Sequence, residues 1–368
     1  MRLVENQRYA ASLARALSGL ELSPLQGRRV LVAGAAGMLG SCVVDLLRSY
    51  GQCEIIAMGR NASALEERFG PADDTYSFCR QDVSEPVTQG LGDVDYIIHA
   101  ASNADPVRMA KDPAGTLMAN VQGTKNLLDY GLSHGMRRFL FVSSGEAYGR
   151  PNANMDDFTE DYCGPLDLSG PRSCYPEGKR AAEVLCQSYI SQFGADAAVV
   201  RPCHLFGPTM ARGDSRAVSE FLRSAAEGRD IVMKSAGLME RSHCYVVDAA
   251  QALLAVLTQG ERGRGYNVAD RRYQMRICDF ARRAAQAGGC QVIFKEPSEL
   301  ERAGYSKVSR AVLDASGWRR WAGDLRRRKR LRRPLQFSEK VREVSHKCEL
   351  LIYTPTVRPQ TDSTPRRR

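Results

Sequence analysis

The sequence lacks any apolar run long enough to cross a bilayer, and its first residues, with Arg2, Glu5 and Arg8, contain no apolar signal-peptide segment. These absences predict a cytoplasmic protein without a membrane span. None of the 11 cysteines forms a Cys-x-x-Cys pair. Without an export signal, scattered cysteines of this kind are expected to be reduced thiols and not a disulfide framework.

Most of the chain also lacks a strong excess of either charge. The net charge is +10, but residues 324–368 alone hold 14 Lys and Arg against 5 Asp and Glu. The remaining residues carry a net charge of about +1, so we expect no nucleic-acid partner for them. The arginine cluster at residues 326–333 could bind an anionic surface, but a solvated and partly disordered tail is the preferred interpretation.

What the sequence does contain is a repeated alternation of short apolar segments and helical ones, which predicts an α/β fold with a doubly wound parallel sheet. The predicted strands are residues 30–33, 54–58, 94–99, 139–142 and 197–200. The predicted helices are residues 5–20, 39–50, 114–130 and 175–193. After residue 208 the alternation loosens into helical patterns at 215–227 and 248–259 and a short strand at 231–233, which suits a smaller C-terminal lobe.

A glycine-rich segment joins the first predicted strand to the first long helix. Gly34 would permit a tight turn, Gly37 would let backbone N–H groups approach a pyrophosphate, and Gly40 would let the helix pack closely on the sheet. The spacing is Gly-x-x-Gly-x-x-Gly, and its position between a strand and a helix favours dinucleotide binding over a structural turn.

The glycine segment divides the chain by function. We expect an N-terminal helical extension over residues 1–27 and a Rossmann-type dinucleotide-binding domain over 28–202. A mostly substrate-binding lobe should follow over 203–323, with a basic tail over 324–368.

No carboxylate follows the second predicted strand, where one would bind an adenosine ribose and favour NAD. Arg60 stands there and could pair with a 2′-phosphate, which favours NADP slightly. Arg60 could equally stack on the adenine of NAD or face solvent. Asp82, between the predicted strands at 54–58 and 94–99, could meet the adenine edge or cap a loop.

Tyr175 and Lys179 lie four residues apart at the start of a predicted helix and so project from one face. An ammonium beside a phenol lowers the tyrosine pKa and makes it usable as a general acid or base. Ser144 and Glu146 follow another strand, so they are expected at the carboxyl edge of the sheet, where open α/β sheets bind ligands.

With these segments in place, the chain resembles the extended short-chain dehydrogenase/reductase family, whose members mostly act on nucleotide sugars. The resemblance covers roughly residues 25–318. It includes the glycine loop, the Tyr-x-x-x-Lys pair, a catalytic Ser or Thr matched by Ser144, and a stretch whose arginine, matched by Arg241, contacts the nucleotide diphosphate.

The resemblance implies a redox-neutral mechanism and a homodimer formed through the helices at 114–130 and 175–193. Tyr175 would take a proton from a sugar hydroxyl while a hydride passes to nicotinamide, and Ser144 would hydrogen-bond the developing carbonyl. Lys179 would hold the nicotinamide ribose. The expected cofactor residues are Gly34, Gly37, Met38, Leu39, Gly40, Arg60, Asp82, Ala100, Tyr175 and Lys179, and the expected substrate residues are Ser144, His204, Arg216 and Arg241.

The branch of the family is less strongly indicated. The 4,6-dehydratases carry Asp-Glu after the catalytic Ser or Thr, where this chain has Gly145 and Glu146. The UDP-glucuronate decarboxylases keep the Glu after a small residue and share a Tyr-x-Glu-Gly-Lys-Arg sequence. Because a 4-ketone beside a carboxylate loses CO₂ readily, a decarboxylase is narrowly preferred, with Glu146 either catalytic or a packing residue.

Two departures affect the expected sugar-nucleotide pocket: His204 replaces the decarboxylase Asn, and His243 replaces an aromatic residue. Arg216 matches a decarboxylase stretch but could lie on a solvated helix face. The histidines and their neighbouring cysteines fit no recognised metal-site spacing, so no metal is expected.

Other readings stay open. The chain could be a nucleotide-sugar 4-epimerase or 4,6-dehydratase, or a net NADPH-dependent carbonyl reductase, which Arg60 favours mildly. It could also be a catalytically silent nucleotide-binding protein. A redox-neutral enzyme should retain its cofactor through purification, whereas a reductase should exchange it.

Overall fold

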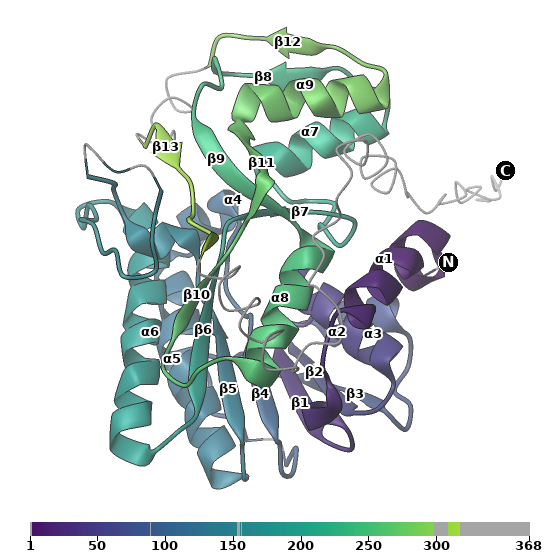
Figure 1. Cartoon of the computed structure of the whole chain (residues 1–368), viewed down its shortest axis with the longest axis vertical. Coiled ribbons are helices and arrows are strands. Elements are labelled where there is room, and N and C mark those ends of the chain that lie inside the picture. Colours follow the sequence, from purple (N-terminus) through teal and green to yellow (C-terminus); the bar gives the residue numbers. More distant parts are fainter. Residues whose placement is uncertain (1, 89, 153–154, 156, 298–307, 317–368) are drawn as a thin grey trace, which may run out of the picture.

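The computed structural model describes residues 2–88, 90–152, 155, 157–297 and 308–316 of the chain. Its centre is a seven-stranded, all-parallel sheet in the order β10-β6-β5-β4-β1-β2-β3 (Figure 1). These strands are β1 (Arg29–Ala33), β2 (Glu54–Gly59), β3 (Tyr76–Arg80), β4 (Tyr96–His99), β5 (Arg138–Val142), β6 (Ala197–Pro202) and β10 (Gly265–Val268). The order reverses at β1 and β4, which is where a doubly wound sheet forms its ligand crevice. The predicted fold class is confirmed.

Helices cover both faces of this sheet because alternate residues of each strand point to opposite sides. Val30 and Val32 pack into one core, and Leu31 and Ala33 into another. The helices of the first face are α1 (Gln7–Ser18), α2 (Met38–Tyr50), α3 (Ala62–Phe69) and α8 (Val246–Gln259), and those of the second are α5 (Pro113–Ser133) and α6 (Cys174–Phe193) (Figure 1). A short helix, α4 (Pro106–Lys111), packs on α5.

The N-terminal helix forms where the amphipathic pattern predicts it, over a slightly shorter span. Asn6 caps α1 by accepting hydrogen bonds from the N–H groups of Arg8 and Tyr9. Tyr9 and Leu13 are buried in the core formed by α2 and α8. The extension is therefore packed onto the large domain.

A smaller lobe stands above the carboxyl ends of the large sheet (Figure 1). Its strands form the order β11-β9-β13, with β7 also paired to β9, and a separate pair β12-β8. Their bounds are β7 (His204–Phe206), β8 (Ile231–Met233), β9 (Glu240–Tyr245), β11 (Asp270–Arg276), β12 (Val292–Phe294) and β13 (Arg310–Ala311). The helices α7 (Ala217–Ala226) and α9 (Ile277–Gly288) pack on each other beside β8.

The chain crosses between the lobes more than once. It leaves the large sheet after β6, but α8 and β10 return to it beyond residue 202. The two lobes are thus distinct in space, but neither is formed by one continuous stretch of sequence. The basic tail over residues 324–368 lies outside the described residues.

Within the described ranges, no helix is both long and apolar enough to span a membrane. The ten cysteines in the same part of the chain are all free thiols.

Candidate active site

A cavity of about 560 Å³ opens at the carboxyl ends of the parallel strands. Its wall follows the sheet: the segments after β1, β2, β3, β4, β5 and β6 each contribute residues. The predicted site residues that line it are Gly34, Gly37, Met38, Leu39, Gly40, Arg60, Asp82, Ala100, Ser144, Tyr175, Lys179 and Arg216. Glu146, His204 and Arg241 are not part of this wall.

The glycine loop has no room for side chains. Gly34 has a φ of +83°, and a Cβ there would lie 2.6 Å from the backbone of Ala100. A Cβ on Gly40 would lie 2.3 Å from the Gly34 carbonyl oxygen. Gly37 caps α2 without a side chain, so the first N–H groups of the helix are open to the cavity. This cradle fits a dinucleotide pyrophosphate.

The end of the cavity beside β2 and β3 is lined by the cation Arg60 and the carboxylate Asp82. Arg60 donates to the Asn103 Oδ1 at 3.3 Å and lies 3.8 Å from Asp82 Oδ2, with 59% of its side chain exposed. Asp82 also accepts hydrogen bonds from the Ser84 hydroxyl and N–H, at 2.6 and 3.0 Å. Asp82 therefore caps its loop and lines the cavity at once.

The three predicted reaction residues come together at the other end. Ser144 caps a short 3-10 helix, η3 (Gly145–Tyr148), and lies close enough to Tyr175 for its hydroxyl to stabilise the phenolate. Lys179 donates to the Val142 carbonyl at 2.7 Å, and its ammonium lies 5.6 Å from the centroid of the Tyr175 ring. All three side chains are at least nine-tenths buried yet line the cavity.

Burial opposes the charged form of both titrating groups. It raises the pKa of Tyr175 to about 12, with the Glu146 carboxylate acting in the same direction. The hydrogen bond from Ser144 and the charges of Arg216 and Arg172 oppose this rise. Burial also lowers the pKa of Lys179 to about 7. Tyr175 is thus a neutral phenol at neutral pH before ligands bind.

Glu146 lies at the rim of the site, held by a residue that no motif marked. Arg172 donates to both Glu146 carboxylate oxygens, at 3.0 and 2.9 Å, while the Glu146 N–H donates to Ser144 Oγ at 3.1 Å. The ion pair is partly exposed. Glu146 is near enough to affect Tyr175 and Arg241 electrostatically.

The smaller lobe brings two arginines towards the reaction residues. Arg216 lines the cavity and donates through Nε to both oxygens of Asp214, at 2.9 and 3.1 Å. Arg241 is only 5% exposed and bonds backbone carbonyls, including that of Val308 at 2.7 Å. Among the described residues, no carboxylate lies within ion-pair distance of Arg241. The buried charge of Arg241 is therefore compensated by backbone carbonyl oxygens and, at longer range, by the Glu146 carboxylate.

The two histidines that depart from the family pattern are neighbours. His204 pairs with His243 across β7 and β9, and the ring centroids are 5.8 Å apart. The Nδ1 of His243 is 3.0 Å from the Tyr273 carbonyl, so this nitrogen carries the proton. Burial lowers the pKa of His243 to about 4, which keeps it neutral.

Sequence reasoning missed several contacts around the site. Besides Arg172, these include a buried ion pair between Glu183 and Arg201 and a link between Asp105 and Ser215. Glu183 had one signal, because it stands four residues after Lys179 and shares its helix face. The other partners meet only through the tertiary fold.

Comparison with known proteins gives a consistent picture. The NAD dependent epimerase/dehydratase family matches residues 30–269. UDP-glucuronic acid decarboxylase 6 of Arabidopsis thaliana is 34% identical over 237 residues, which are 64% of this chain and 67% of that protein. UDP-glucuronic acid decarboxylase 1 of Xenopus tropicalis is 34% identical over 241 residues, 64% of this chain and 55% of that protein. The match thus spans between half and two thirds of these relatives' own length.

Solved structures share the fold at lower identity. UDP-glucose 4-epimerase of Thermotoga maritima, solved with UDP-glucose, has a TM-score of 0.70 at 21% identity and covers 88% of this chain and 97% of its own. A dTDP-glucose 4,6-dehydratase of Streptomyces venezuelae, solved with NAD, has a TM-score of 0.70 at 22% identity over 88% of this chain and 96% of its own.

Proposed function

Because the chain belongs to the NAD dependent epimerase/dehydratase family, we propose that it modifies a nucleotide sugar through a transient 4-keto intermediate, and that it acts as a UDP-glucuronate decarboxylase. The observation that carries the nucleotide part is Arg241. This guanidinium is 5% exposed and has no carboxylate in ion-pair range in the described part of the chain, so a bound anion would offset the cost of burying its charge. A nucleoside diphosphate supplies that anion in a bidentate form that arginine binds well.

The residues present fit a nicotinamide dinucleotide, which when bound supplies a hydride acceptor and donor. The glycine cradle would hold its pyrophosphate and Lys179 its nicotinamide ribose. Ser144 and Tyr175 stand together at the same end of the cavity as Lys179. A sugar hydroxyl placed between them would lose its proton to the Tyr175 oxygen, and Ser144 would stabilise the carbonyl that forms.

The loop after Ser144 supports decarboxylation over dehydration. Dehydration by the expected route needs an acidic side chain at position 145, which is glycine here. A Cβ on Gly145 would lie 3.1 Å from Leu313 Cδ2, so even a small side chain requires Leu313 to move. Loss of CO₂ beside a 4-ketone needs fewer acid and base residues. Glu146, the acidic residue that this loop does have, is held by its ion pair with Arg172.

We propose that the site accepts NAD or NADP, with a slight preference for NADP. The exposed Arg60 guanidinium can pair with a 2′-phosphate, and no carboxylate ends β2. Asp82, 3.8 Å from Arg60, reduces this preference because it already offsets part of the charge. The same arginine is the observation that favours the second candidate, a net NADPH-dependent carbonyl reductase.

We propose a homodimer that buries the outer faces of α5 and α6. These helices pack against each other, and each still exposes large apolar side chains. The exposed side chains are Met118 and Leu132 on α5, and Val184 and Phe193 on α6. A Val184→Asp substitution should shift the mass measured by light scattering from dimer to monomer, whereas a polar change at Leu168, away from both helices, should not.

We also propose the expected division into a dinucleotide domain, a substrate lobe and an N-terminal extension. A cytoplasmic location is part of the same proposal. The two lobes meet around the cavity, which takes residues from both. This arrangement supports one lobe holding the dinucleotide and the other the sugar nucleotide.

The first test is to denature the purified protein and identify the released molecules by mass spectrometry, and then to supply UDP-glucuronate. We expect bound NAD or NADP in near-equal amount to protein, release of CO₂, and no net reduction of cofactor. The Tyr175→Phe variant should bind cofactor and release no CO₂. A product inverted at C4 that keeps its carboxylate would instead establish an epimerase. Consumption of one NADPH per turnover would establish a reductase, and full activity in Tyr175→Phe would exclude the mechanism.

A further inference from the structure

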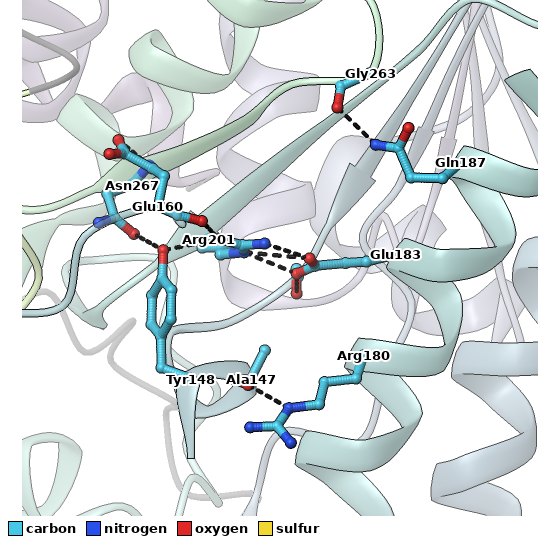
Figure 2. Close-up of polar contacts among 10 residues, drawn as sticks. Ala147, Tyr148, Glu160, Arg180, Glu183, Gln187, Arg201, Gly263 and Asn267 are labelled. Atoms are coloured by element: carbon cyan, nitrogen blue, oxygen red, sulfur yellow. Dashed lines mark hydrogen bonds and ion pairs between the residues drawn. The ribbon is translucent and has the colours of Figure 1, made fainter. Parts of the chain in front are cut away.

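Helix α6 holds the loop that carries Ser144 at more than one point. Lys179 donates to the Val142 carbonyl at 2.7 Å, just before the loop. Arg180 donates to the Ala147 carbonyl at 2.6 Å, near its end (Figure 2). The loop between these contacts is therefore fixed against the helix that carries Tyr175.

Glu183, one helical turn further on, adds a third contact. Its carboxylate accepts a hydrogen bond from the hydroxyl of Ser143, the residue before Ser144. The same carboxylate accepts from Arg201 Nε at 3.0 Å and from Nη2 at 2.6 Å. The side chains of Glu183 and Arg201 are only 15% and 16% exposed, so the pair is well shielded from water.

Arg201 extends the network to the far end of the loop. Its Nη1 donates to the Tyr148 hydroxyl oxygen at 2.9 Å, and that hydroxyl donates to Asn267 Oδ1 at 2.7 Å (Figure 2). Ser143 and Tyr148, which flank the loop, are thus tied to one ion pair. Loss of this pair would release both ends of the loop together.

The position of Glu183 also matters for charge. Glu183 lies four residues after Lys179 and eight after Tyr175, on the same helix face. The other titratable groups near the Lys179 ammonium include Tyr175, whose ring centroid lies 5.6 Å away, and His99 from β4, which burial keeps neutral by lowering its pKa to about 3. Arg201 pairs with Glu183. Glu183 opposes the fall that burial causes in the Lys179 pKa.

We propose that Glu183, paired with Arg201, is a positioning residue that fixes the Ser144 loop against α6 and supplies the negative charge that keeps Lys179 an ammonium. The ammonium is needed because it stabilises the phenolate of Tyr175 and holds the nicotinamide ribose. The inference rests on the proposed function for the identity of the reaction, but the charge on Lys179 can be measured without any substrate.

A purely structural ion pair is the competing explanation, and two substitutions separate it from the proposal. Glu183→Gln keeps the shape of the side chain and one acceptor oxygen and removes its charge. Arg201→Lys keeps the charge and removes the two-pronged geometry. A structural role predicts that both variants lose stability with no effect on the titration of Lys179.

The experiment is a pH titration of protein labelled with [6-¹³C]lysine, followed by NMR, with Lys179→Met used to assign the Lys179 resonance. We expect Glu183→Gln to lower the titration midpoint of Lys179 by about one pH unit or more. Arg201→Lys should leave that midpoint within about 0.3 units of the wild type. With a turnover assay, Glu183→Gln should also lower kcat at pH 7 by roughly tenfold and change KM little.

An unchanged midpoint in Glu183→Gln would overturn the inference, and so would an equal shift in Arg201→Lys. If Glu183→Gln fails to fold, the double variant Glu183→Gln with Arg201→Met removes both charges and leaves none buried alone. A smaller fall in the midpoint is expected in that variant, because the Arg201 charge, which acts against that of Glu183, is lost as well. A lowered midpoint in a protein that turns over no nucleotide sugar would support the inference and overturn the proposed function instead.

Discussion

Asp105 joins the two lobes by accepting two hydrogen bonds from Ser215, one from its N–H at 2.8 Å and one from its hydroxyl at 2.7 Å. Asp105 follows β4 and lines the cavity, whereas Ser215 belongs to the smaller lobe. On the other side, the Thr209 hydroxyl donates to the Met38 carbonyl at 2.8 Å. The segment from Thr209 to Ser215 therefore crosses the cavity and is fastened at both ends.

This fastening predicts that the cofactor leaves slowly. Ser215→Ala removes one solvent-exposed hydrogen bond to a charged acceptor, a loss of about 1.5 kcal/mol, which corresponds to roughly a tenfold faster dissociation. The rate can be followed by the fluorescence of bound NADH or NADPH during displacement. Ser169→Ala, which removes an exposed hydroxyl bonded only to nearby Asp167, is the matched control. Equal rates in the two variants would show that this segment does not retain the cofactor.

The Glu146–Arg172 ion pair predicts opposite shifts in the pH dependence of the reaction. Glu146 raises the pKa of Tyr175 and Arg172 lowers it. A tyrosine that acts as a base gives a rate that rises with pH through its pKa. Glu146→Gln should therefore move this rising limb to lower pH, and Arg172→Ala should move it to higher pH.

The quantity to compare is the midpoint pH of the rising limb and not the maximal rate, because a direct catalytic contribution of Glu146 would change the maximal rate as well. The measurement is kcat/KM as a function of pH for the wild type and both variants. Lys111→Ala, which removes an exposed charge, serves as the control for net charge. Shifts in the same direction for Glu146→Gln and Arg172→Ala would contradict the assignment of Tyr175 as the base.

The charge of the buried Lys179 ammonium, which the proposed reaction needs, should lower the stability of the folded protein. Burial lowers its pKa in the folded protein to about 7, whereas the unfolded value is close to 10.5. Between these values the unfolded state binds more protons, so this group makes the wild type more stable as pH rises from 7 to 10. Lys179→Met removes this dependence of the stability on pH. The variant should be more stable than the wild type below pH 7, by at most about 5 kcal/mol, with the difference narrowing towards pH 10.

Denaturant unfolding at pH 6 and pH 9 tests this directly, because the difference between the two proteins isolates the one group. Lys125→Met is a suitable control, since Lys125 is about half exposed and its ion pair with Asp129 spans one helical turn. A stability difference for Lys179→Met that is the same at both pH values would mean that Lys179 keeps its ordinary pKa when folded.

The large sheet could be predicted because its signals are local. Each buried parallel strand is a short apolar run, and the helices between them repeat apolar residues at helical spacing. In the smaller lobe the apolar run Ile231–Met233 predicted β8 in the same way, but β9 carries no such signal. In β9 (Glu240–Tyr245), all residues but the first are buried, yet the sequence Glu-Arg-Ser-His-Cys-Tyr is mostly polar. It forms a strand because β7 and β11 pair with it from distant parts of the chain.

The same distinction holds within the site. Tyr175 and Lys179 could be identified because a fixed spacing on one helix places them together. Arg201 could not, because its partners Glu183 and Tyr148 meet it only when β6, α6 and η3 are assembled. Residues that act through a shared element are visible in sequence, whereas residues that meet across elements need the fold.

Arg241 provides the last prediction, in which binding and stability change in opposite directions. Its guanidinium is 5% exposed and, within the described ranges, faces carbonyl oxygens without a carboxylate partner. Burial lowers its pKa, which shows that the folded protein disfavours this charge. Arg241→Met should therefore unfold at a higher temperature than the wild type when no nucleotide is present. The same variant should bind UDP at least about 100-fold more weakly, because a buried charge-assisted pair is lost.

Arg138→Met is the contrasting control: Arg138 is paired with Asp196 at 2.7 Å, so its loss should lower the melting temperature and leave UDP binding unchanged. Scanning calorimetry of both variants gives the melting temperatures, and titration calorimetry gives the UDP affinities. A lower melting temperature for Arg241→Met with unchanged UDP affinity would assign Arg241 a structural role.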